Sequence, residues 1–168
     1  PEPEAFNDLD NETLEKLQKF PAIIGDSIER FRFREASQEL LNLARLGNKY
    51  LADEEPWKQI KENPERVKTI LFVALQIAGG LAIVCEPFLP FTSVKLKGIL
   101  GMTENLTWES VEKSNPLIEA NHQIGKAELL FAKIEELEIE VQLEKLEATK
   151  LVNDAENTLP EPQKETID

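Results

Sequence analysis

The sequence predicts an all-α protein, organised as a bundle of about four to five helices. Apolar residues recur at steps of three and four along most of the 168 residues, and patterns typical of strands are few. Glycine occurs only 7 times, whereas 10 prolines are spread along the chain. Hydrophobic residues make up 41% and charged residues 30%, which is ordinary for a soluble globular domain.

A first helix is expected to begin near Asp8 or Asp10, after a polar connector of residues 1–8. One apolar stripe follows at helical spacing, formed by Leu14, Leu17, Phe20, Ile24, Ile28 and Phe31. Pro21 falls inside this stripe. Because proline lacks a backbone N–H and its ring clashes with the preceding turn, we expect it to kink or split the helix.

A second helix is predicted over about residues 33–52, with one apolar face along its length. The segment that leads into Pro56 ends it, and residues 57–64 are expected to form a short polar connection. Pro64 is suited to the first position of the next helix, where its missing N–H would have no partner in any case.

A third helix, over about residues 65–86, is the most apolar part of the chain. From Thr69 to Cys85 the only polar side chains are those of Thr69 and Gln76. This run of 17 residues is shorter than the ~20 that span a membrane, and a glutamate and a proline follow it directly. We therefore interpret it as the central helix of the bundle, with two consecutive glycines that allow a neighbouring helix to approach.

Three segments complete the predicted bundle. A short helix is expected over about residues 91–100, an irregular stretch with short helical turns over 101–127, and a glutamate-rich helix over about 131–157. We therefore expect residues 9–157 to form one helical domain and residues 158–168 to form a disordered linker.

The net charge of −13 is concentrated at the two ends of the sequence. Residues 1–27 carry −5 and residues 128–168 carry −8, whereas residues 28–70 hold nine basic against eight acidic groups. The nine are Arg30, Arg32, Arg34, Arg45, Lys49, Lys58, Lys61, Arg66 and Lys68. They could face phosphates, but on charge alone ordinary solvated helix faces are the simpler interpretation.

The sequence gives no support for catalysis or metal binding by this segment. The single histidine, His122, has no second ligand at metal spacing, and no glycine-rich phosphate loop is present. The single cysteine, Cys85, lies in the apolar run, which favours a buried thiol in a reducing compartment such as the cytoplasm. No signal peptide is visible, and a start at Pro1 suggests a piece of a longer protein.

One constellation stands out at the end of the second predicted helix, in the segment NKYLADEEPW. Asn48 and Tyr50 precede the end of the helix, and Trp57 follows Pro56, where the helix must stop. Taken alone, a tryptophan that fills the end of the bundle is the simpler interpretation. The alternative is a platform on which an unpaired base stacks, a contact worth ~1–3 kcal/mol.

The order of several segments resembles the C-terminal helical bundle of methionyl-tRNA synthetases, a class I family. After the Asn-x-Tyr and Pro-Trp pairs come an apolar helix, a Leu-Pro-Phe turn and an Ile-Gly-Lys … Leu-Phe-x-Lys-Ile segment. The matching positions are Asn48, Tyr50, Pro56, Trp57, Leu89, Pro90, Phe91, Ile124, Gly125, Lys126, Leu130, Phe131, Lys133 and Ile134. The match spans about residues 30–135, and the Pro-Trp pair together with the Ile-Gly-Lys segment favours methionine.

This resemblance implies an anticodon-binding domain in which Trp57 helps to recognise the first base of a CAU anticodon and Pro56 shapes the turn. Asn48 and Tyr50 are weaker candidates for base contact, and they are equally open to the role of holding the Trp57 turn. Candidate phosphate contacts are Arg45, Lys49, Lys58 and Lys61.

The resemblance also implies a parent enzyme, methionine–tRNA ligase, which uses ATP and L-methionine in a catalytic domain. The HIGH and KMSKS signatures of that domain are absent here. Expected partners are tRNA-Met, the parent's catalytic domain and a possible tRNA-binding module after residue 168, with no membrane. An Asn and an Arg that the family uses from a preceding helix have no counterpart before residue 30, so we expect the chain to begin after that helix and to bind weakly alone.

Two alternatives remain open from the sequence. A non-enzymatic interaction module could dock partners on its acidic last helix without RNA, as the total charge favours. The equivalent domain of another class I synthetase would keep the bundle and prefer a different anticodon. Dependence of RNA binding on Trp57 separates the first from our interpretation, and comparison of anticodon loops separates the second.

Overall fold

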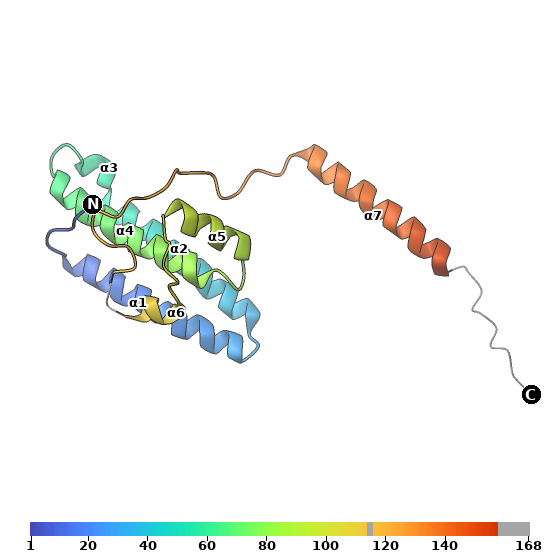
Figure 1. The fold of residues 1–168 in the computed structure, drawn as a ribbon, viewed down its shortest axis with the longest axis horizontal. Helices are drawn as coiled ribbons and strands as arrows, with labels where there is room; N and C mark the ends of the chain where they lie inside the picture. Colours follow the sequence, from blue (N-terminus) through green and yellow to red (C-terminus); the bar gives the residue numbers. More distant parts are fainter. Residues whose placement is uncertain (114–115, 158–168) are drawn as a thin grey trace, which may run out of the picture. The chain divides into compact units, whose positions relative to one another are not determined.

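The computed structural model describes residues 1–113 and 116–157, and every regular element in these ranges is a helix. The helices are α1 (Asp8–Glu29), α2 (Phe33–Glu54), α3 (Pro56–Gln59), α4 (Pro64–Val84), α5 (Pro90–Ile99), α6 (Trp108–Glu112) and α7 (Glu136–Asn157), labelled in Figure 1. The predicted all-α class is confirmed. The expected linker of residues 158–168 lies outside the described residues.

The chain divides into two compact units, residues 1–130 and the part from Phe131 onward. The single bundle expected over residues 9–157 is therefore divided in the structure, and helices α1–α6 form the first unit. Helix α7 begins at Glu136, five residues later than the predicted start at 131. The side chains of α7 whose exposure is described are exposed. No packing within this unit therefore extends the helix back to residue 131.

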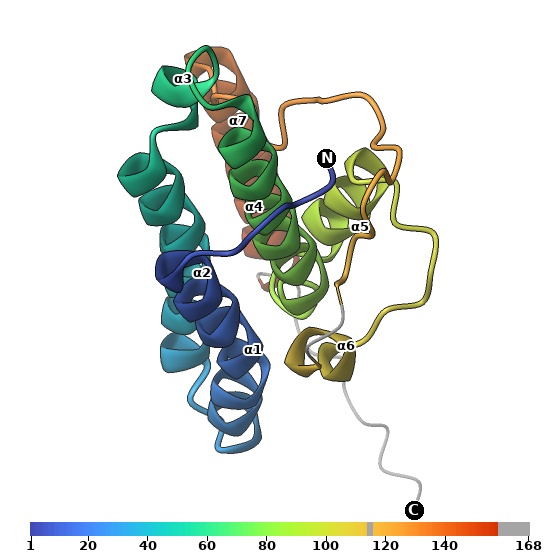
Figure 2. The ribbon, with the colours of Figure 1, turned by 90° about the vertical axis from the view of Figure 1, so that its left-hand side faces the viewer.

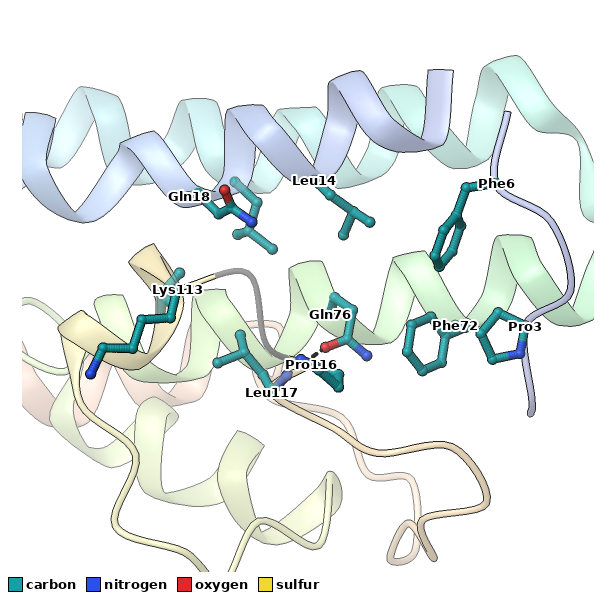
Figure 3. A pocket seen from close by; sticks show the side chains of 11 residues that line it. Pro3, Phe6, Leu14, Gln18, Phe72, Gln76, Lys113, Pro116 and Leu117 are labelled. Atoms are coloured by element: carbon teal, nitrogen blue, oxygen red, sulfur yellow. Dashed lines mark hydrogen bonds between the residues drawn. The ribbon is translucent and has the colours of Figure 1, made fainter. Parts of the chain in front are cut away.

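The segment before α1 is docked rather than free. Asn7 and Asp10 form a capping box in which each side chain accepts from the other's backbone N–H, at 2.8 and 2.9 Å. The ring of Phe6 lies 6.2 Å from that of Phe72 on α4. Beside this pair is a cavity of about 230 Å³, lined mainly by apolar side chains of the N-terminal segment, α1, α4 and the chain after α6 (Figure 3).

Helix α1 continues through Pro21, so the expected split is wrong. Pro21 is buried against the core, as are Leu17 and Ile24 one turn to either side. The proline removes one intrahelical hydrogen bond, but the buried apolar face on both sides of it keeps the two halves in one helix.

The turn from α1 to α2 places Phe31 in the left-handed region, with φ 59°. The N–H of Phe31 bonds to the carbonyl of Ile28 at 2.9 Å, and that of Arg32 bonds to the carbonyl of Ser27 at 2.8 Å. This pair of bonds is the Schellman pattern, which usually has glycine at the left-handed position. A side chain there costs ~1–2 kcal/mol. The prediction that Phe31 ends the buried stripe is wrong, because α1 ends before it and the residue is 81% exposed.

Helix α4 is the centre of the first unit, as predicted, with α1 and α2 on one side and α5 on the other (Figure 2). A Cβ at Gly80 would lie 2.7 Å from Cδ1 of Leu17, so this glycine permits the close approach of α1. Helix α4 is long and apolar enough to cross a membrane, but 67% of its most apolar window is buried inside the unit. That burial is expected of a core helix.

Polar side chains inside the unit tie the irregular segment to α4. The buried amide of Gln76 donates to the carbonyl of Ile118 at 2.8 Å and accepts from the N–H of Leu117 at 2.7 Å. The hydroxyl of Ser93 on α5 donates to the carbonyl of Ala82 at 2.6 Å. Cys85 is buried, as its sequence context predicts.

Candidate nucleic-acid interface

The chain reverses between α2 and α4 through a turn that presents Trp57. Glu55 ends α2 in the left-handed conformation, with φ 43°, and its N–H bonds to the carbonyl of Leu51 at 3.0 Å. Pro56 then begins the one-turn helix α3, which occupies part of the short polar connection predicted over residues 57–64. Pro56 is buried, whereas Trp57 is 60% exposed. The tryptophan therefore does not fill the end of the bundle, and most of its indole is free to meet a ligand.

A network of buried and half-buried polar groups lies under this turn and joins three helices. Arg66 on α4 donates to Oδ1 of Asp10 on α1 at 2.9 Å and pairs with Oε1 of Glu54 on α2 at 2.7 Å. The hydroxyl of Tyr50 donates to Oδ1 of Asp10 at 2.6 Å. Gln59 on α3 donates to the backbone carbonyl of Glu54, which ties the short helix to the same network.

The electrostatics of the network fix its protonation. Burial alone would raise the pKa of Asp10, but hydrogen bonds from Arg66, Tyr50 and the backbone of Asn7 outweigh it and lower that pKa. Burial, together with the hydrogen bond to Asp10, raises the pKa of Tyr50 far above its usual range. The hydrogen bond to Asp10 likewise raises the pKa of Arg66. At neutral pH the network therefore holds a carboxylate, a neutral phenol and a guanidinium.

Two of the residues singled out in the sequence, Tyr50 and Arg66, have their polar groups engaged inside the bundle. Tyr50 is only 2% exposed and its hydroxyl bonds to Asp10, so little of its side chain is open to a base, and it stays a candidate for holding the turn through the network of Asp10, Arg66 and Glu54. Arg66 belongs to the basic group of residues 28–70, but its side chain is 15% exposed and is engaged by two carboxylates. Asn48 is exposed on α2 and stays a candidate for base contact.

The four phosphate-contact candidates are exposed and fall into two places. Lys58 and Lys61 follow Trp57 in sequence, and Lys58 pairs with Glu55 at 2.7 Å. Arg45 and Lys49 line a groove between α1 and α2, with an apolar floor that includes Phe20. Lys49 pairs with Asp53 at 2.6 Å, whereas Lys61 forms no ion pair with any residue of the described ranges. Such exposed pairs are weak, so that phosphates can displace them.

Two further cations line the same groove and were not among the candidates. Lys16 and Lys19 of α1 face Arg45 and Lys49 of α2 across it. The net charge by segment gave no sign of them, because they lie in residues 1–27, whose net charge is −5. Their spacing of three residues on an amphipathic helix is the signal that could have placed them on one exposed face. Among the described residues, no group of three or more His, Cys, Asp or Glu side chains could hold a metal.

Comparison with known proteins connects this geometry to one family. The family model described as the anticodon binding domain of methionyl tRNA ligase matches residues 1–150. The methionine–tRNA ligase of Flavobacterium psychrophilum is 57% identical over 167 residues, which are 99% of this chain and 24% of that protein. That of Christiangramia forsetii is 58% identical over 170 residues, covering 98% of this chain and 25% of that protein.

A solved structure shares the fold. The apo form of Mycobacterium tuberculosis methionyl-tRNA synthetase superposes with a TM-score of 0.73 at 18% identity, over 80% of this chain and 28% of that one. The chain thus spans about a quarter of the length of the curated relatives it matches.

Proposed function

The chain belongs to the family of anticodon-binding domains of methionyl tRNA ligases, and from this premise we propose that it recognises the CAU anticodon of tRNA-Met through Trp57. The observation that carries the proposal is the exposed indole of Trp57 on a turn in which the preceding residue, Pro56, is buried. A bundle end without a ligand gains nothing from an exposed tryptophan in a rigid turn. A base that stacks on the indole gains ~1–3 kcal/mol.

The rigidity of the turn supports sequence-specific recognition. Proteins usually read RNA sequence from unstacked bases in loops, and this requires groups held at fixed positions. Glu54 lies three residues before Trp57 and is fixed by Arg66, which also binds Asp10. The indole therefore projects from a point at which α1, α2 and α4 are tied together.

Cations near the turn supply affinity that is independent of sequence. Lys58 and Lys61 lie within four residues of Trp57, and Asn48 is exposed toward the end of the preceding helix. We assign the lysines to phosphates and Trp57, with Asn48 beside it, to base recognition. Tyr50 and Pro56 act through the turn that they hold.

The parent protein would be a cytoplasmic methionine–tRNA ligase. Its catalytic domain, outside this chain, would activate L-methionine with ATP and transfer it to tRNA-Met. A further tRNA-binding module could follow residue 168. In this arrangement the segment described here selects the tRNA and takes no part in bond making.

The test is a binding titration at low salt with two anticodon stem-loops, one bearing CAU and one with an altered first base. Wild type is compared with Trp57→Ala and with Phe91→Ala, a matched control that removes a ring 90% exposed on α5. We expect Trp57→Ala to weaken CAU binding about tenfold and to abolish the preference, with Phe91→Ala unchanged. A preference for CAU that survives Trp57→Ala would refute the assignment.

A further inference from the structure

The turn between α1 and α2 lies at the end of α2 opposite to α3, the short helix that carries Trp57 (Figure 2). This turn exposes aromatic rings and cations together. Its sequence over residues 30–34 is Arg-Phe-Arg-Phe-Arg. Phe31 and Phe33 are 81% and 56% exposed, and their rings meet edge to face with centroids 6.3 Å apart. Neither ring belongs to the buried core.

Packing does not explain why a phenyl ring stands at residue 31. The backbone there is left-handed, and glycine meets the two hydrogen bonds of the turn without strain. The side chain is directed to solvent, so its removal opens no cavity. A ring kept at a strained and exposed position indicates a role in binding.

The arginines of the turn are available to phosphates. Arg30 pairs with Asp26 at 2.8 Å and Arg32 with Glu35 at 3.4 Å, and all four side chains are more than half exposed. Arg34 forms no ion pair with any residue that the structure describes, and it lines a groove beside Ile23. An exposed guanidinium next to an exposed ring is the combination that binds nucleotides by phosphate contact and stacking.

A basic path leads from this turn toward Trp57. The groove beside Arg34 shares Ile23 and Glu39 with the groove of the phosphate candidates. The combined groove runs along the α1–α2 face, and its cations are Lys16, Lys19, Arg34, Arg45 and Lys49. Glu35 and Glu39 are the acidic groups that line it, so five cations stand against two carboxylates and the balance of charge favours a polyanion.

We propose that the Arg30–Arg34 turn is a second RNA-binding site, at which Phe31 stacks on an unpaired nucleotide of the same RNA whose anticodon loop lies at Trp57. The proposal rests on the proposed function, since it takes the position of that RNA from Trp57. The α1–α2 groove carries the phosphates between the two contacts.

The separation of the two sites makes the proposal testable. Helix α2 has 22 residues and is ~33 Å long, at a rise of 1.5 Å per residue. A stem of about five base pairs is only about 17 Å long, even at the 3.4 Å per pair of B-form DNA. With its stem along the α1–α2 groove, an isolated anticodon stem-loop held at Trp57 therefore ends before the Phe31 turn, whereas a complete tRNA extends past it.

The experiment measures the affinity of the 168-residue chain for complete tRNA-Met and for its anticodon stem-loop. The variants are Phe31→Gly, Arg34→Ala and Trp57→Ala, with Phe91→Ala as the exposed-ring control. We expect Phe31→Gly to weaken binding to the complete tRNA about fivefold or more and to leave stem-loop binding unchanged. Arg34→Ala should lower the salt dependence of complete-tRNA binding by about one unit of slope. Trp57→Ala should weaken binding to both RNAs.

Two results would overturn the inference without touching the proposed function. One is a Phe31→Gly protein that binds the complete tRNA as wild type does while Trp57→Ala does not. The other is equal weakening of both RNAs by Phe31→Gly, which would show that the turn acts through the fold. Circular dichroism and the unfolding temperature of Phe31→Gly accompany either measurement; the spectrum should match wild type, and the unfolding temperature should equal or exceed it, because glycine relieves the left-handed strain. If the wild-type chain binds neither RNA, the proposed function fails as well.

Discussion

Replacing Asp10 by Asn tests whether the polar network under the Trp57 turn holds the bundle together. Asp10 is fully buried and receives hydrogen bonds from Arg66 and Tyr50. Breaking a buried ion pair by removing one partner costs ~3–5 kcal/mol, because the remaining charge stays buried. Arg66 keeps Glu54 at 2.7 Å, which places the expected loss at the lower end, about 3 kcal/mol.

The assay is reversible unfolding by urea and by heat, with Glu12→Gln as the matched control. Glu12 pairs with Lys16 at 2.7 Å, but both side chains are more than half exposed, so its loss should change the free energy of unfolding very little. For a unit of this size, 3 kcal/mol corresponds to a fall of roughly 10 °C in the unfolding temperature. If Asp10→Asn destabilises the protein no more than Glu12→Gln does, the network does not hold the bundle together.

The pH dependence of stability tests the role of Asp10 independently. The pKa of Asp10 is lowered in the folded state from 3.8, so the unfolded chain binds its proton first as pH falls. The stabilisation from this carboxylate is therefore complete above the unfolded pKa and is lost as pH falls through the folded pKa. The difference in stability between wild type and Asp10→Asn should be constant near neutral pH and shrink below about pH 4.

Three further predictions address other parts of the first unit. Tyr50→Phe should lower the free energy of unfolding by about 1.5–3 kcal/mol, the value of a hydrogen bond to a charged group, and leave the ratio of affinities for CAU and altered stem-loops unchanged; a changed ratio would return Tyr50 to base contact. Gly80→Ala should destabilise by about 1–3 kcal/mol in urea unfolding, because its Cβ would lie 2.7 Å from Cδ1 of Leu17, whereas Gly98→Ala, with no atom within 4 Å, should be neutral or stabilising; the reverse order would contradict the close approach of α1 and α4. Lys61→Ala should reduce the slope of log affinity against log salt by about one, and an unchanged slope would remove it from the phosphate contacts.

Local sequence signals predicted the helices well because most boundaries are set by nearby residues. Pro64 begins α4, and the break at Pro56 fixes the turn that carries Trp57. The start of α7 was missed because the apolar spacing continues through residues 131–135, where the structure has no helix. Pro21 was overestimated as a helix breaker, since burial of its neighbours is a tertiary effect.

Side-chain roles at the candidate site were harder to predict than its position. Tyr50 follows Lys49 and Arg66 follows Glu65 in the sequence, and their common partner Asp10 is 40 and 56 residues away. The periodicity of apolar residues carries no information about contacts between residues so far apart in the sequence. Phe31 was assigned to the core because its spacing continues the apolar stripe, but α1 ends at Glu29 and turns the ring outward.

The shared arginine also determines where the chain can change length. Glu54 is fixed by Arg66, and Trp57 follows three residues later. An insertion or deletion between Glu54 and Trp57 would therefore point the indole in a different direction. Residues 60–63, between α3 and α4, carry no such tie to α2, and added loop length there has a small entropic cost. Length variation among descendants of this chain should therefore accumulate after α3 and be excluded before it.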